Sequence, residues 1–153
     1  MNRQPYIEKW ISVLYRTGRS YFEYRAEEYG VSSSGIFFLL CLYRQQGASQ
    51  DAISKILNVD KATASRIGAT LEILGYVTRQ QDLKDKRAYE VFLTEKGRQL
   101  EPKMELILEE WAHIVTKDFT REEEKVAYQL LQRMASKAID AKNDHWDIGE
   151  QIL

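Results

Sequence analysis

The chain has 153 residues, of which 44% are hydrophobic and 29% are charged, and its formal net charge is −1. This length suits one domain with a real core and not a large multidomain enzyme, and the composition is that of a globular protein and excludes a disordered chain. The longest apolar run, Ile36–Leu42, is too short to span a membrane. Residues 1–6 lack the apolar core of a secretory signal, so we expect a cytoplasmic protein.

The charges are distributed unevenly along the chain. Residues 1–47 hold 6 basic and 4 acidic side chains, residues 48–98 hold 9 and 7, and residues 99–153 hold 7 and 12. The local balances are therefore +2, +2 and −5. Acidic residues are concentrated in the last third, which leaves the rest mildly basic and compatible with a polyanionic partner.

Two helices are expected before residue 48. Pro5 suits the first turn of a helix over Tyr6–Tyr29, which Gly30 ends. Its apolar stripe predicts one buried face: Ile7, Trp10, Ile11, Leu14, Gly18, Tyr21, Phe22 and Arg25. Ser32 or Ser33 can cap the next helix, Ile36–Gln46, which is apolar nearly all round and should be buried.

The run Ala48–Gly97 reads as a short helix, a tight turn, a second helix and two strands. Ser49 can cap the first helix, Gln50–Leu57, and the turn Asn58–Asp60 breaks it. Asp60 can cap the second helix, whose apolar positions recur every three or four residues. The positions expected to face inward are Ala64, Ile67, Leu71 and Leu74.

The outward face of this second helix carries a cation, hydroxyl groups and small side chains. Its members are Lys61, Ala62, Thr63, Ser65, Arg66 and Ala69. No large carboxylate is present to repel phosphate, and no wide apolar stripe requires a protein partner. The face is therefore typical of a helix that enters a groove of DNA.

After Gly75, residues 76–79 and 89–93 are rich in β-branched and aromatic residues and predict a hairpin. Its tip, Asp82–Arg87, has three cations in four positions, enough to reach a phosphate backbone or a minor groove. We interpret the tip as a wing.

Two long helices should follow the hairpin. Thr94 can cap a fifth helix, in which Pro102 either causes a kink or marks the first full turn. Its apolar face comprises Leu100, Met104, Ile107, Leu108, Trp111, Ile114 and Val115. Thr120 and Glu123 form a capping-box pattern for a sixth helix, which should continue to about Ala141. The tail 143–153 offers Trp146, Ile148, Ile152 and Leu153 as partner-facing apolar residues.

The first, fifth and sixth helices carry more apolar surface than the run Ala48–Gly97, about fifty residues, can cover. The simplest partner is a second copy. A two-fold dimer built on the first, fifth and sixth helices would place two reading helices about one turn of DNA apart (~34 Å).

Four motifs in this order resemble the MarR family of winged helix-turn-helix transcription regulators. They are Asp60–Ile67, Leu71-Glu72 followed by Gly75–Arg79, Asp82-x-Lys84-Asp85-x-Arg87, and Leu93-Thr94-x-Lys96-Gly97. The third resembles the family's D-x-R-D-x-R wing, with Lys84 in place of the first arginine. The resemblance implies a long N-terminal helix, two long C-terminal helices, a dimer and a pseudo-palindromic operator.

The expected fold is mainly α with a small β-hairpin wing, in a single MarR-type unit over 1–153. Within it we expect a winged helix-turn-helix DNA-binding region over 31–98. Helical dimerisation regions should cover 5–30 and 99–142, and a C-terminal tail should cover 143–153.

The predicted DNA-binding residues lie on the reading helices and the wing: Ser49, Lys61, Thr63, Ser65, Arg66, Lys84 and Arg87. Asp82 and Asp85 should stabilise the wing. Arg66 could grip phosphate or guanine with its planar fork, or it could bridge to an aspartate of the wing. Gly68–Thr70 replaces bulkier and more charged family residues, so fewer phosphate contacts are expected there, and Lys84 lacks the fork of an arginine.

Cys41 is the only cysteine, which excludes an internal disulfide, and its apolar surroundings favour a buried, inert thiol. Glu109, Glu110 and His113 have helical spacing, but with one other histidine, His145, we expect no metal site. No catalytic triad, phosphate-binding glycine loop or pair of catalytic carboxylates is evident, so we expect no enzyme activity and no cofactor.

The resemblance also implies release from DNA by a small, often aromatic, ligand. Tyr15, Phe22 and Trp111 could line such a site, although aromatic residues at helical spacing are more often plain core. The leading hypothesis is a homodimeric, sequence-specific DNA-binding regulator that acts as a ligand-responsive repressor. The alternative is a winged-helix module that binds proteins and no duplex DNA.

Overall fold

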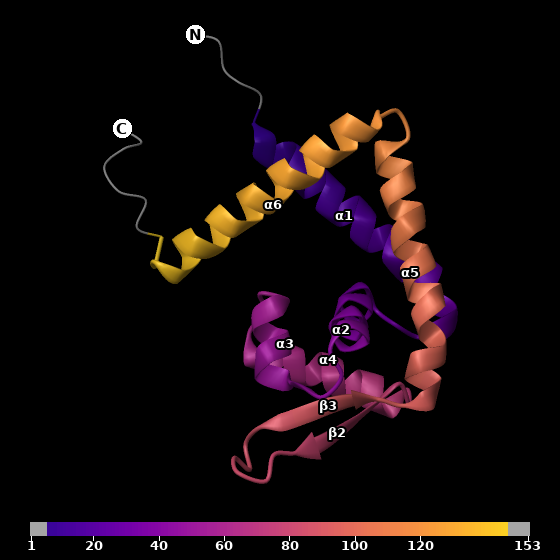
Figure 1. Ribbon diagram of the computed structural model, residues 1–153, viewed down its shortest axis with the longest axis vertical. Coiled ribbons are helices and arrows are strands. Elements are labelled where there is room, and N and C mark those ends of the chain that lie inside the picture. Colours follow the sequence, from indigo (N-terminus) through magenta and orange to yellow (C-terminus); the bar gives the residue numbers. More distant parts are fainter. Residues whose placement is uncertain (1–5, 147–153) are drawn as a thin grey trace. The chain divides into compact units, whose positions relative to one another are not determined.

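The helices form close to their expected positions. The computed structural model describes residues 6–146 of the chain (Figure 1). The helices are α1 Ile7–Ala26, α2 Ser33–Arg44, α3 Gln50–Ile56, α4 Lys61–Ile73, α5 Glu95–Thr116 and α6 Arg121–Asn143, and a 3₁₀ turn covers Glu27–Tyr29. The strands are β1 Ala48–Ser49, β2 Val77–Gln81 and β3 Tyr89–Leu93. The chain divides into two units, Met1–Ala112 and His113–Leu153.

The expected N-terminal caps are confirmed, and Ser32 rather than Ser33 caps α2. Each capping oxygen accepts a hydrogen bond from the backbone N–H three residues on, which satisfies a group that the helix itself leaves unpaired. The pairs are Ser32 with Gly35 (3.1 Å), Ser49 with Ala52 (3.1 Å), Asp60 with Thr63 (2.7 Å), Thr94 with Gly97 (3.0 Å) and Thr120 with Glu123 (3.2 Å). Glu123 completes the capping box by accepting from the Thr120 N–H.

Two helix ends differ from the prediction by a few residues. The first helix tightens into the 3₁₀ turn before Gly30, whose φ of 68° is in the left-handed region that glycine tolerates. The second ends at Arg44 instead of Gln46. Pro102 lies inside α5, where its side chain is exposed; Pro5 lies outside the described residues.

The sheet has three antiparallel strands where the sequence predicted two. Its order is β1-β3-β2: Val77 pairs with Leu93 and Gln81 with Tyr89, while Ala48 pairs with Val91. A strand of two residues is too short to show alternation, so β1 could not be recognised from sequence. This pairing attaches the start of α3 directly to the hairpin.

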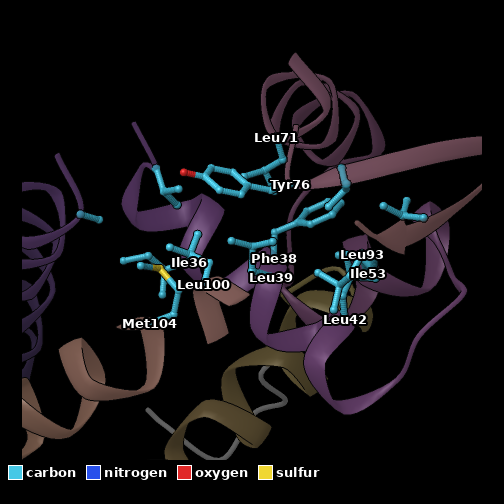
Figure 2. Packing of buried hydrophobic residues seen from close by; sticks show 14 of the residues in the cluster. Ile36, Phe38, Leu39, Leu42, Ile53, Leu71, Tyr76, Leu93, Leu100 and Met104 are labelled. Carbon is cyan, nitrogen blue, oxygen red and sulfur yellow. The ribbon is translucent and has the colours of Figure 1, made fainter. Parts of the chain in front are cut away.

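The core of the first unit lies where α2 packs against α4, the sheet and α5. Ile36, Phe38, Leu39 and Leu42 of α2 are fully buried, as the sequence predicted for this helix. Figure 2 labels these side chains together with six other members of the cluster: Ile53, Leu71, Tyr76, Leu93, Leu100 and Met104. The reading elements α3, α4 and the hairpin therefore share one hydrophobic core.

A tight junction connects the end of the hairpin to α5. The Thr94 N–H donates to the Tyr76 carbonyl (3.0 Å), and the Thr94 hydroxyl donates to the Gly75 carbonyl (2.6 Å). The Tyr43 hydroxyl donates to the Gly97 carbonyl (3.1 Å). A Cβ atom on Gly97 would lie 2.0 Å from the Tyr76 carbonyl oxygen, so no larger residue fits without moving backbone.

Within the first unit, α1 is attached to α5 by a polar cluster and an aromatic contact. The Tyr21 hydroxyl donates to Glu110 (2.8 Å), which also pairs with Arg25 (2.9 Å). The Trp111 ring packs against Gly18, where a Cβ atom would lie 3.1 Å from the ring. This close contact explains why a glycine interrupts the apolar stripe of α1.

Most of the second unit is α6, none of whose residues is buried. Its exposed apolar residues are Val126, Tyr128, Leu130, Leu131 and Ile139. Among residues 6–146, no helix is long and apolar enough to cross a membrane. Of the expected partner-facing tail residues, Trp146 is exposed, and Ile148, Ile152 and Leu153 lie outside the described residues.

Candidate nucleic-acid interface

The outward face of α4 is formed largely as predicted. Lys61, Ala62 and Arg66 are exposed, while Thr63, Ser65 and Ala69 are half-buried. On the inward side Ala64 and Leu71 are buried, and Ile67 and Leu74 are half-buried against the core cluster. The N-terminal two turns of α4 thus offer cations and hydroxyl groups to a partner.

Arg66 is held by the first turn of its own helix. Its Nη2 donates to the Thr63 hydroxyl oxygen (3.0 Å), and the Thr63 hydroxyl donates to Asp60 Oδ2 (2.8 Å). The hydrogen bond from the Thr63 N–H is the main cause that lowers the pKa of Asp60, which therefore remains a charged cap. Within residues 6–146 this contact takes the place of the bridge from Arg66 to a wing aspartate that the sequence left open.

A carboxylate that sequence reasoning missed lies beside this face. Asp51, in the first turn of α3, has Oδ1 2.8 Å from Lys61 Nζ and Oδ2 2.9 Å from Lys55 Nζ. Asp51 belongs to α3, so it does not appear in the sequence of α4 and reaches Lys61 only through the fold. Its spacing from Lys55, four residues on a helix, was the available signal.

Gly68 lies on the buried side of α4, so it is not part of the outward face. A Cβ atom there would lie 3.4 Å from Gln50 Oε1 and from the Phe38 ring, and 3.6 Å from Arg79 Cδ. Its departure from the family pattern therefore concerns packing against α3 and β2. Thr70, by contrast, is exposed, and its hydroxyl donates to the Arg66 carbonyl (3.0 Å).

The wing tip is shaped by its two aspartates. Asp82 Oδ1 accepts from the N–H groups of Lys84 (2.6 Å) and Asp85 (3.1 Å), and Asp85 Oδ1 accepts from the Arg87 N–H (2.9 Å). The hydrogen bonds from the Lys84 and Asp85 N–H groups lower the pKa of Asp82. The side chains of Lys84 and Arg87 are exposed on this ordered loop, as is Leu83, which is 100% exposed.

Glu72 connects α4 to the wing. Its carboxylate accepts from the Arg79 N–H (3.0 Å) and Nε (3.0 Å) and lies 2.9 Å from Nη2. The Arg79 guanidinium also stacks on the Tyr89 ring of β3, 5.4 Å from its centroid. The end of α4 and both strands of the wing are thereby fixed to one another.

Protonation of the Glu72 carboxylate at low pH should weaken its contact with Arg79. The Arg79 backbone N–H is the main cause that lowers the pKa of Glu72, against the opposing effect of burial. Because the pKa is lowered on folding, the stabilisation is complete above the unfolded value of about 4.3 and is lost as pH falls through the folded value. We expect the NMR signal of the Arg79 amide to shift with a midpoint below pH 4.3. A midpoint above that value, or the same titration in Glu72→Gln, would contradict this assignment.

Ser49 and two of the three predicted effector-binding aromatic residues, Phe22 and Trp111, already make contacts that hold the fold together. Ser49 is half-buried and its hydroxyl oxygen already accepts the Ala52 N–H. Phe22 and Trp111 are in contact, with ring centroids 5.9 Å apart, whereas Tyr15 is 67% exposed. The first two contribute to the packing of α1 on α5.

Cys41 is not fully buried, contrary to the prediction. It is half-buried and lines a hollow of about 450 Å³ together with Phe37, Leu40 and Ile56. Partial burial raises the pKa of its thiol, which disfavours the reactive thiolate. In the part of the chain that the structure describes, no three His, Cys, Asp or Glu side chains are grouped to hold a metal ion.

The geometry defines a winged helix-turn-helix: α3 and α4 joined by a turn at Asn58, whose φ is 52°, followed by a hairpin with a basic tip. The family model described as "MarR family" matches residues 31–89. A MarR transcriptional regulator from Methanosarcina mazei Go1 has 40% identity to this chain and a TM-score of 0.83, covering 90% of this chain and 99% of its own.

Two further proteins resemble this chain, one with lower sequence identity and one over a shorter stretch of sequence. A putative MarR family regulator from Listeria monocytogenes, solved in complex with 26mer DNA, has 25% identity and a TM-score of 0.85, covering 98% of this chain and 100% of its own. The uncharacterised HTH-type transcriptional regulator YybA of Bacillus subtilis is 29% identical over 97 residues, 63% of this chain and 65% of YybA. The chain thus spans slightly less than two thirds of that relative.

The chain belongs to the MarR family, and it is a DNA-binding transcriptional regulator of the winged helix-turn-helix class. The predicted family and fold class are confirmed.

Proposed function

We propose that the protein reads a pseudo-palindromic operator as a homodimer and represses transcription by occupying it. One observation carries the DNA-reading part: exposed cations project from two neighbouring elements, Lys61 and Arg66 from α4, and Lys84 and Arg87 from the ordered wing. We propose that α4 enters the major groove and that the wing tip lies along the adjacent minor groove. In this arrangement Thr63 and Ser65 contact the DNA through their hydroxyl groups, and Ser49 lies beside the DNA backbone.

The dimer part is supported by unburied apolar surface on the terminal helices. On α1, the residues Ile7, Trp10, Ile11, Leu14 and Tyr15 are 43–67% exposed and follow helical spacing. The apolar residues of α6 are likewise exposed within their own unit. Contiguous apolar surface on helices is typical of a protein interface, and a second copy supplies a matching one.

Disrupting the α1 surface should separate the copies. Leu14→Glu places a charge among apolar residues, so we expect sedimentation equilibrium at micromolar concentration to give one chain mass where the wild type gives two. Ile73→Glu is the matched control, because Ile73 is an 86% exposed apolar residue on α4, outside the proposed interface. A dimeric Leu14→Glu variant would exclude α1 from the interface.

Selection of bound fragments from random duplex DNA tests the reading function. We expect enrichment of two inverted half-sites whose centres are about one helical turn apart. The competing function, a protein-binding module, predicts no duplex affinity at all. Titration in increasing salt separates the two, because a DNA reader should lose affinity with a log–log slope of about −0.9 per neutralised phosphate.

Ligand control of this repressor stays a prediction. Tyr15, Phe22 and Trp111 were the expected aromatic contacts, and Phe22 with Trp111 already form packed core. A ligand that entered there would have to displace Trp111 from Gly18. Any such ligand should therefore change the fluorescence of Trp111, and a Trp111→Phe variant should lose that change.

A further inference from the structure

Asp51 forms an ion pair with Lys61 of the proposed reading face. Its two carboxylate oxygens lie 2.8 Å from Lys61 Nζ and 2.9 Å from Lys55 Nζ. Both lysine side chains are highly exposed, 82% for Lys61 and 77% for Lys55, whereas that of Asp51 is 39% exposed. One fixed carboxylate therefore accompanies two cations that would otherwise be free to pair with phosphate.

The capping of α3 does not depend on this carboxylate. The N-terminus of α3 is already capped by Ser49, whose oxygen accepts the Ala52 N–H. Ion pairs between exposed side chains contribute little to stability. The hydrogen bonds from Lys61 and Lys55 lower the pKa of Asp51 to about 2, so the negative charge is present throughout the physiological range.

The carboxylate also lies inside the site. A hollow of about 570 Å³ separates the starts of α3 and α4 from the wing, and it is lined by Ser49, Asp51, Lys61, Asp85 and Arg87 among others. Three of these are predicted DNA contacts. A negative charge in this position faces whatever phosphate or base edge approaches Lys61 and Arg87.

We propose that Asp51 is a specificity-determining residue that suppresses binding to non-operator DNA. This inference rests on the proposed DNA-reading function. Non-specific binding is almost entirely electrostatic, so the carboxylate weakens it both by repelling phosphate and by neutralising Lys61. Operator binding also draws on base contacts, which tolerate this loss and benefit from a Lys61 side chain held in one place.

Asp51→Asn tests the proposal, because it removes the charge and keeps the shape. The probes are a duplex selected by the wild-type protein and a scrambled duplex of the same composition. We expect affinity for the scrambled duplex to rise roughly tenfold or more, and its salt slope to steepen by about 0.9 per protomer as Lys61 gains a phosphate. Affinity for the selected duplex should change by much less, so the ratio of the two affinities falls.

Glu95→Gln is the matched control. Glu95 also pairs with a cation on its own helix, Arg98 at 3.3 Å, but it lies at the start of α5, outside the proposed reading face and the proposed dimer surface. This variant changes the net charge equally and should leave the ratio of affinities unchanged. A ratio altered equally by both variants, or unaltered in Asp51→Asn, would overturn the proposal.

A double-mutant cycle checks that the effect passes through Lys61. Lys61→Ala should reduce affinity for the scrambled duplex more in the Asp51→Asn background than in the wild type. Equal losses in both backgrounds would overturn the role given to Lys61. Failure of the wild-type protein to bind any duplex in a salt-dependent way would instead refute the proposed function itself, so the two failures are distinguishable.

Discussion

Arg66→Ala should weaken operator binding by about 100-fold or more. A specific arginine contact to DNA contributes about 1–3 kcal/mol, and a dimer loses it twice. The substitution should not harm the fold, because Arg66 is exposed and its side-chain contact is to Thr63 on the same helix. The measurement is a titration of the selected duplex at fixed salt, with helix content followed by circular dichroism.

Two further variants sharpen this test. Arg66→Lys keeps the charge but not the planar fork, so an intermediate loss indicates that the fork grips two acceptors. Arg121→Ala removes an exposed arginine from the start of α6 and should leave affinity nearly unchanged. Wild-type affinity in Arg66→Ala at matched salt would contradict the placement of α4 in the major groove.

Gly97→Ala should destabilise the protein by about 3 kcal/mol or more, because the new Cβ atom would lie 2.0 Å from the Tyr76 carbonyl oxygen. The atom it meets belongs to backbone, which cannot rotate away. The Tyr76 carbonyl also accepts the Thr94 N–H, so relief of the clash costs a second interaction. Chemical denaturation should show the loss as a lower midpoint.

Gly68→Ala is the matched comparison. Gly68 also lies in a helix and is also buried, but the nearest atoms to its new Cβ would be 3.4 Å away, an ordinary contact. Alanine favours a helix interior over glycine by about 1 kcal/mol, so this variant should be neutral or slightly more stable. Similar losses for the two glycines would show that the contact at Tyr76 relaxes easily.

The sequence predicted those features that depend on a residue and its near neighbours along the chain. Caps such as Ser49 and Asp60 need only a side-chain oxygen three residues before an unpaired N–H, so they could be recognised directly. The buried face of α2 followed from its apolar run. The same local logic indicated the wing, where Asp82 and Asp85 bond to backbone two or three residues on.

Features that join distant segments could not be predicted in this way. The strand β1 exists because Ala48 and Ser49 pair with Val91 and Glu90, more than forty residues later in the printed sequence. The ion pair between Asp51 and Lys61 needs the turn that folds α4 back on α3. A family motif marked Gly97, but only the packed structure gives the physical reason for a glycine there.

The contact between Glu72 and Arg79, a clasp between α4 and β2, bears on how the operator sequence of such a regulator could change. The orientation of α4 is set at its C-terminal end by this clasp and by the Tyr76 hydroxyl, which donates to the Tyr29 carbonyl (2.9 Å). The residues that face a groove lie at the other end of the helix, from Lys61 to Arg66. The residues that orient α4 and the residues that face DNA thus lie at opposite ends of one helix. The outward residues Lys61, Ala62, Thr63, Ser65 and Arg66 can be exchanged to read a new operator, while the buried Ala64 and the contacts that orient α4 stay the same.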